Sequence, residues 1–159
     1  MILAPRHPDK FGGFETSRPG AGFVIQKKTA LDASRPWDIL LLDTIGELAR
    51  MYAAGDAAFI GGSLIPWGGQ NLLEPAFYGK PIVFGPHMKN FAVLAEAFEG
   101  GGGAKTVRTE DDIAAFFAFD DPAGMEEMGR RSKEILRSLQ GATRRSLAAM
   151  ESLLEERDA

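Results

Sequence analysis

Residues 61–75 combine two glycine pairs with an amide and a carboxylate, reading Gly-Gly-Ser-Leu-Ile-Pro-Trp-Gly-Gly-Gln-Asn-Leu-Leu-Glu-Pro after an apolar run at 57–60. Glycines let the backbone approach a ligand closely, and the first turn of a helix attracts anions. Pro75 is tolerated only in a first turn, so we expect a helix to begin near Asn71. Glu74 would then be placed to accept hydrogen bonds from ribose hydroxyls. The segment predicts a site for a nucleotide sugar.

A second candidate residue is Arg6, which stands between Pro5 and His7-Pro8. Prolines on both sides stiffen the backbone, and rigid presentation suits an arginine that contacts a phosphate or a base. The alternative is a solvated surface arginine. His7 and His87 each lie beside a proline without a neighbouring carboxylate, which favours a structural role for both.

A third candidate segment, Asp-Thr-Ile-Gly-Glu at 43–47, fits the start of a helix. Thr44 and Glu47 have the spacing of a capping box, which explains most of the segment without any ligand. Gly46 is not explained by capping, because glycine destabilises a first turn. A planar base lying against the backbone at Gly46 would explain it, and both interpretations stay open at this point.

Short apolar runs alternate with amphipathic patterns along the chain. Helices are expected at 45–52, 91–98 and 109–117, the last with Thr109 as its N-cap. A long helical stretch from 125 to 156, interrupted near 140–141, is expected to follow. Alternating strands and helices indicate an α/β fold, a doubly wound parallel sheet with helices on both faces. Ligands of such sheets bind beyond the carboxyl ends of the strands, where the candidate residues fall. The expected strands are 2–5, 23–26, 39–42, 57–60, 81–84 and 105–107.

Composition excludes several other classes of protein. A net charge of −4 argues against a nucleic-acid partner, and the absence of cysteine excludes disulfides and thiolate-bound zinc. No segment approaches the roughly 18 to 20 apolar residues that span a bilayer. The glycine patterns of dinucleotide-binding, P-loop and serine-hydrolase sites are also missing. We expect a cytoplasmic domain that uses neither a metal nor a cofactor.

The order of these motifs resembles one family, the 3-deoxy-D-manno-octulosonic acid (Kdo) transferases, which move Kdo from CMP-Kdo to lipid A precursor in lipopolysaccharide biosynthesis. The matching segments are 4–8, 43–47, 61–64, 68–75, 79–81 and 85–88. The resemblance implies the Rossmann-like C-terminal half of a GT-B glycosyltransferase, with a CMP-Kdo-binding domain at 1–140 and a C-terminal helix at 141–159. The CMP contacts that it implies are Pro5, Arg6, Ile45, Gly46, Glu47, Asn71, Leu72, Leu73 and Glu74.

The chain also departs from the family pattern. The family's N-terminal acceptor domain, which holds a glutamate base, and the first βα unit have no counterpart in the sequence, and 11–22 is a poor crossover helix. We therefore expect a donor-binding part without catalytic residues that is inactive alone. The apolar surface that the missing unit would cover is expected to be exposed or to pair with another copy of the chain. Full-length family members would act at the cytoplasmic face of the inner membrane. The alternatives are another GT-B transferase or epimerase domain, or a non-catalytic nucleotide-binding module.

Overall fold

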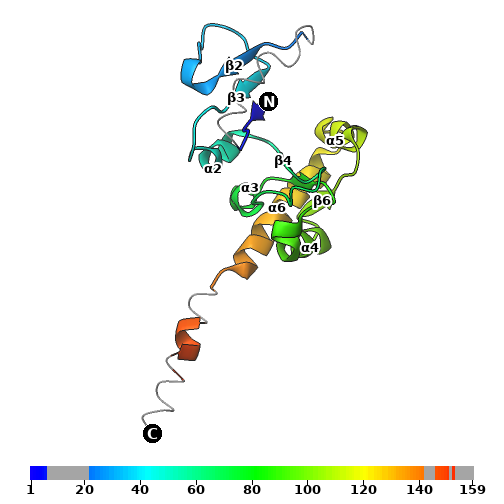
Figure 1. Ribbon diagram of the computed structural model, residues 1–159. Helices are drawn as coiled ribbons and strands as arrows, with labels where there is room; N and C mark the ends of the chain where they lie inside the picture. Colours follow the sequence, from blue (N-terminus) through cyan, green and yellow to red (C-terminus); the bar gives the residue numbers. More distant parts are fainter. Residues whose placement is uncertain (7–21, 142–145, 151, 153–159) are drawn as a thin grey trace. The chain divides into compact units, whose positions relative to one another are not determined.

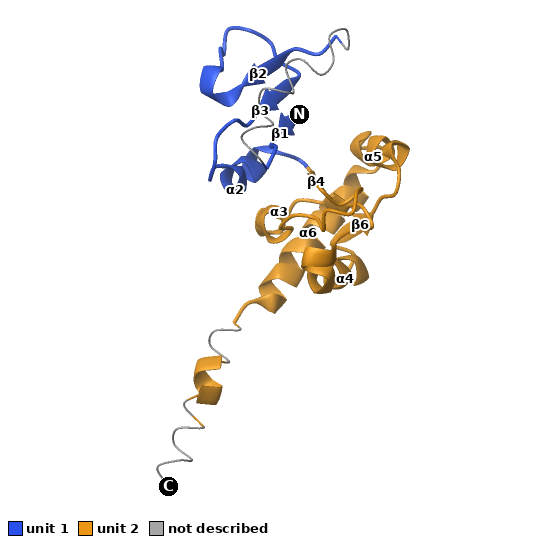
Figure 2. Cartoon of the chain, in the orientation of Figure 1, with its two compact units in different colours: residues 1–56 blue, residues 57–159 orange. Residues whose placement is uncertain are grey.

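The computed structural model describes residues 1–6, 22–141, 146–150 and 152 of the 159-residue chain. The chain divides into two compact units, Met1–Asp56 and Ala57–Ala159 (Figure 2). His7 and most of the predicted poor helix at 11–22 lie outside the described residues, so the predictions for them stay untested. The boundary that the sequence predicts at residue 140 also stays a prediction.

The first unit, called unit 1 below, is built on a parallel three-stranded sheet in the order β1-β3-β2 (its strands are labelled in Figure 2). The strands are β1 (Ile2–Leu3), β2 (Ile25–Lys27) and β3 (Ile39–Leu41). Leu40 and Leu41 of the central strand β3 are buried, and so is Leu42, which follows the strand. Among the described residues, the unit also has the short helices η2 (Lys28–Ala30), α2 (Leu48–Met51) and η3 (Tyr52–Ala54).

The second unit, unit 2, has its own parallel sheet in the order β4-β5-β6. The strands are β4 (Ala58–Ile60), β5 (Ile82–Phe84) and β6 (Ala104–Thr106). All three residues of the central strand β5 are buried, as expected for a parallel strand that is covered on both faces. The hydrophobic core cluster of unit 2 joins β4 and β5 to the helices and includes Ile60, Leu72, Ile82, Phe84 and Phe98.

The helices between and after the strands of unit 2 include α3 (Leu73–Phe77), η4 (Lys89–Phe91), α4 (Ala92–Gly100), α5 (Glu110–Phe117) and α6 (Pro122–Leu139). The longest, α6, packs against α3, α4 and β5 (Figure 1). The close approach of α6 to the residue before β6 requires glycine there, because a Cβ on Gly103 would lie 2.8 Å from the Cα of Ser132 in α6. α6 begins with Pro122 in its first turn and ends at Leu139.

The predicted α/β class with parallel strands is confirmed, and all six predicted strands are present within two residues of their expected ends. The strands are distributed over two three-stranded sheets, one in each unit. The predicted N-cap at Thr109 is also confirmed, since Thr109 and Asp112 form a capping box at the start of α5. Among the described residues, none of the helices is long and apolar enough to cross a membrane.

Candidate functional site

The turn at 44–47 in unit 1 differs from the predicted helix start. Gly46 has a φ of 86°, a left-handed conformation that an α-helix excludes. The helix α2 therefore begins only at Leu48, with Glu47 as its N-cap, and the predicted capping box between Thr44 and Glu47 is wrong. A Cβ on Gly46 would meet no atom within 4 Å, so the peptide at Gly46 is open, and the neighbouring Ile45 is 79% exposed.

The Glu47 carboxylate is held by two side chains of unit 1. The Nζ atom of Lys28 lies 2.6 Å from Oε1 and 2.8 Å from Oε2, and the Thr44 hydroxyl donates to Oε2. The hydrogen bonds from Lys28 and then Thr44 hold the pKa of Glu47 below its ordinary value. Both members of the ion pair are partly exposed, so the carboxylate is charged and reachable from solvent.

A second carboxylate fixes the same turn from its other end. Asp43, directly after β3, accepts hydrogen bonds from the backbone N–H of Thr29 at 3.0 Å and from its hydroxyl at 2.5 Å. The hydroxyl contact is the main reason that the pKa of Asp43 is lowered. The residues that follow β2 are thus tied to the residues that follow β3 by Lys28 and Thr29 together.

The remaining predicted contacts of unit 1, Pro5 and Arg6, follow β1. Pro5 is partly buried and Arg6 is exposed. β1 pairs with β3 in parallel, with Leu3 opposite Leu41. Both segments therefore leave the carboxyl edge of one sheet, which is the edge where parallel α/β folds bind ligands.

In unit 2, the loop after β4 is bound to the loop after β5 through Ser63. The Ser63 hydroxyl is fully buried, donates to the Ile60 carbonyl at 2.5 Å and accepts from the Gly85 N–H at 2.7 Å. The Ser63 carbonyl accepts from the His87 N–H at 2.9 Å. A side chain on Gly85 would overlap the Ser63 carbonyl group, so glycine is required there.

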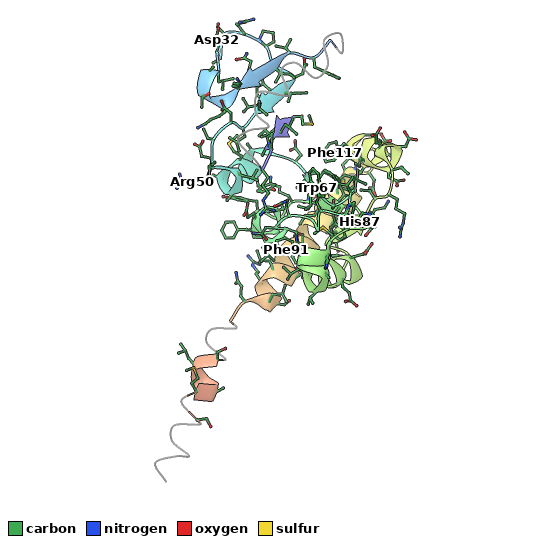
Figure 3. All side chains as sticks on the ribbon, viewed as in Figure 1. Asp32, Arg50, Trp67, His87, Phe91 and Phe117 are labelled. Carbon is green, nitrogen blue, oxygen red and sulfur yellow. The ribbon has the colours of Figure 1, made fainter. Side chains whose placement is uncertain are left out.

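The second glycine pair closes the same loop. Gly68 and Gly69 have φ values of 88° and 74°, and the Gly69 N–H donates to the Gly62 carbonyl at 3.0 Å. A Cβ on Gly68 would lie 2.5 Å from the Asn90 amide nitrogen. These glycines therefore serve loop closure and packing, and the close approach of a ligand that the sequence suggested stays a prediction. Trp67, labelled in Figure 3, lies between the pairs. Its exposed fraction is 70%.

The predicted contacts at 71–74 form a compact group at the start of α3. The Asn71 Oδ1 atom accepts from the Leu73 N–H at 3.0 Å, and its Nδ2 atom donates to Oε1 of Glu74 at 3.2 Å. The helix begins at Leu73, two residues later than predicted, and has only five residues, so its dipole is weaker than the sequence suggested. The Leu72 side chain is buried in the core, which leaves only its backbone for a ligand.

An open cavity of about 490 Å³ lies in unit 2 beyond β5 and β6. His87, Lys89, Glu96 and Thr106 line it, and none of the residues at 71–74 do. Among the described residues, no group of three or more histidine, aspartate or glutamate side chains is arranged to hold a metal ion.

Sequence reasoning missed Lys28, which contacts a predicted site residue. Lys28 and its partner Glu47 are 19 positions apart, so no local pattern joins them. The register of β2 and β3, with Lys27 opposite Leu41, brings both chain segments out at the same edge. The available signal was the position of Lys28 two residues after the predicted strand at 23–26.

The parallel α/β architecture, with polar groups and glycine turns gathered after the strands, is that of the nucleotide-binding half of a GT-B glycosyltransferase. Comparison with solved structures agrees: the C-terminal CMP-Kdo binding domain of WaaA from Acinetobacter baumannii matches with a TM-score of 0.76 and 27% identity, over 85% of this chain and 72% of that one. No protein-family model matches the chain.

Curated relatives identify the family. A 3-deoxy-D-manno-octulosonic acid transferase of Bordetella pertussis is 36% identical over 97% of this chain and 37% of its own length. The transferase of the same name from Haemophilus influenzae is 30% identical over 98% of this chain and 37% of its own length. The chain belongs to the Kdo transferase family, and it spans 37% of the length of these two relatives.

Proposed function

We propose that this chain holds the CMP-Kdo donor of a Kdo transferase. The observation that carries the proposal is homology to Kdo transferases over nearly the whole chain, together with a fold that matches a CMP-Kdo binding domain. The site geometry supports it, because the predicted contacts follow the strands of both sheets. Within unit 1 the proposed contacts are Pro5, Arg6 and 45–47, and within unit 2 they are 71–74.

The chemistry proposed for these residues is to bind and orient the leaving group. In an inverting displacement, CMP departs from the anomeric carbon of Kdo while a base deprotonates the acceptor hydroxyl. The Arg6 guanidinium would offset the charge that develops on the phosphate. Among the described residues, the Glu74 carboxylate accepts one hydrogen bond, which the Asn71 amide donates to Oε1. Its remaining acceptor sites are enough for two ribose hydroxyls. Three further features stay predictions from the family: the glutamate base, a lipid A precursor as the acceptor, and action at the inner membrane.

Titration with CMP, UMP and UDP-GlcNAc tests the proposal, with tryptophan fluorescence as the readout. Trp67 is 70% exposed in the loop next to 71–74, and a Trp37→Phe variant removes the signal of the other tryptophan. We expect a saturable response to CMP at lower concentration than to either uridine nucleotide. An equal response to all three, or none, would contradict the proposal.

A Glu74→Ala variant tests the assigned ribose contact. Removing the charged acceptor should weaken CMP binding by a few kcal/mol at most, since one hydrogen bond to a charged group is worth about 1.5–3 kcal/mol. Calorimetry with CMP measures the change. Glu126→Ala, at an exposed position of α6 outside the proposed contacts and outside the cavity, is the matched control. An unchanged affinity in Glu74→Ala would reduce Glu74 to a partner of Asn71.

A further inference from the structure

The Glu47 carboxylate has little hydrogen-bonding capacity left in this structure. A carboxylate offers about four lone-pair sites. Lys28 contacts both oxygens and Thr44 contacts Oε2, so among the described residues these three contacts leave one site, on Oε1. Glu74 differs, since its one contact there comes from Asn71. Glu47 is therefore suited to one further donor, and Glu74 to a pair of hydroxyls.

The surroundings of Glu47 suit a flat ring. The side chain of Ile45 is 79% exposed, and the peptide at Gly46 has open space where a side chain would otherwise stand. An apolar side chain beside an open peptide favours contact with the face of a planar group. A ring packed there would place its edge towards the next residue, Glu47.

We infer that Lys28 and Thr44 fix the Glu47 carboxylate as the acceptor for the exocyclic amino group of cytosine, and that this cluster sets a preference for cytosine over uracil. The inference rests on the proposed function. Carboxylates accept well from the N4 amino group of cytosine. Uracil carries a carbonyl oxygen at the same position, which a carboxylate repels.

Lys28 is a positioning residue in this inference. It holds the carboxylate in one orientation and keeps it charged, and Asp43 and Thr29 hold η2, the helix that carries Lys28. Lys28→Met should therefore lower base discrimination, although Lys28 itself contacts no base. Lys28→Arg should retain base discrimination, because a guanidinium can also pair with both carboxylate oxygens.

The test is calorimetric titration of the full chain and its variants with CMP, UMP and 2′-deoxy-CMP. For the unmodified chain we expect CMP to bind at least about tenfold more tightly than UMP, the effect of one hydrogen bond to a charged group. Glu47→Gln should bring the two within about twofold, since an amide can donate to uracil as well as accept from cytosine. Lys28→Met should reduce the ratio by about three- to tenfold.

Matched variants separate this inference from the proposed function. Glu74→Gln should weaken CMP and UMP alike and reduce the preference for CMP over 2′-deoxy-CMP. Lys105→Met removes the same charge as Lys28→Met from an exposed position of β6, and it should leave every ratio unchanged. Circular dichroism verifies that each variant is folded.

Two results would overturn the inference while the proposed function stands. One is CMP binding with an unchanged CMP-to-UMP ratio in both Glu47→Gln and Lys28→Met. The other is a Glu47→Gln variant that loses only its preference for CMP over 2′-deoxy-CMP, which would assign Glu47 to the ribose. If the unmodified chain binds no CMP, the proposed function fails and the inference fails with it.

Discussion

The buried hydroxyl of Ser63 joins the ends of two neighbouring strands. It is the only link that the described residues show between the Ile60 carbonyl and the Gly85 N–H. Ser63→Ala leaves both of these backbone groups without that partner inside the protein, so we expect the free energy of unfolding to fall by about 2–3 kcal/mol. Urea denaturation measures the change.

Ser138→Ala is the matched control for that prediction. Ser138 also donates its hydroxyl to a backbone carbonyl, that of Ile135 at 2.8 Å, but it lies on an exposed part of α6. We expect its loss to change stability by less than about 0.5 kcal/mol. Equal effects of the two substitutions would show that the Ser63 bridge adds nothing beyond an ordinary surface hydrogen bond.

Two glycines that follow neighbouring strands allow a second test at the same scale. Gly85 has no room for a side chain because of the Ser63 carbonyl, whereas Gly61 has open space and no left-handed φ. Gly85→Ala should destabilise the protein by about 1–3 kcal/mol through overpacking. Gly61→Ala should be close to neutral. Thermal unfolding compares the two variants, and a neutral Gly85→Ala would contradict the tight contact.

At the scale of elements, α6 carries an exposed ion-pair network on one face. Glu127 pairs with Arg130 and Arg131 one turn later, and Arg130 also pairs with Glu134. Hydrogen bonds from the two arginines lower the pKa of Glu127 from 4.5 to about 2. The network therefore stabilises the folded state above pH 4.5, and the contribution is lost as the pH falls through about 2.

Comparison with Glu127→Gln tests this pH dependence. The difference in the free energy of unfolding between the two proteins should be greatest above pH 4.5 and shrink as the pH falls towards 2. High salt should also reduce it, because all four groups are exposed. Denaturation at a series of pH values measures the difference, and a difference that stays constant with pH would exclude titration of Glu127 as its source.

Two helix starts show how far local patterns predict elements. At Thr109 the capping pattern is correct, because Asp112 lies in the helical turn that the pattern requires. At Thr44 the same spacing fails, because Gly46 takes a left-handed conformation and Lys28 draws the Glu47 carboxylate away from the backbone. The sequence had already indicated that helix capping does not explain Gly46, and the left-handed φ of Gly46 agrees with that interpretation.

At the scale of the whole molecule, the two units have unequal cores. Among the described residues, the buried apolar side chains of unit 1 are Leu40, Leu41 and Leu42, whereas those of unit 2 join both faces of β5 to its helices. Burial of apolar surface supplies most of the stabilisation of a fold. Unit 1 should therefore open more readily than unit 2.

Amide hydrogen exchange measures this difference. Amides of β5 (Ile82–Phe84) should exchange at least about tenfold more slowly than those of β3 (Ile39–Leu41), although each is the central strand of its sheet. Equal protection of the two strands would mean that the units unfold as one. Protection gained by both strands on addition of CMP would in turn support the proposed function.

The amino-acid sequence by itself determined the six strands, the parallel α/β class, the cap at Thr109 and the family. These features depend on residues a few positions apart, or on motifs that keep their order along the chain. Only the tertiary structure decided the division into two sheets, the pairing of Lys28 with Glu47 and the bridge from Ser63 to Gly85. The two contacts join residues 19 and 22 positions apart, and the division into sheets is a matter of which strands pair. All three depend on strand register and loop conformation, which local patterns do not encode.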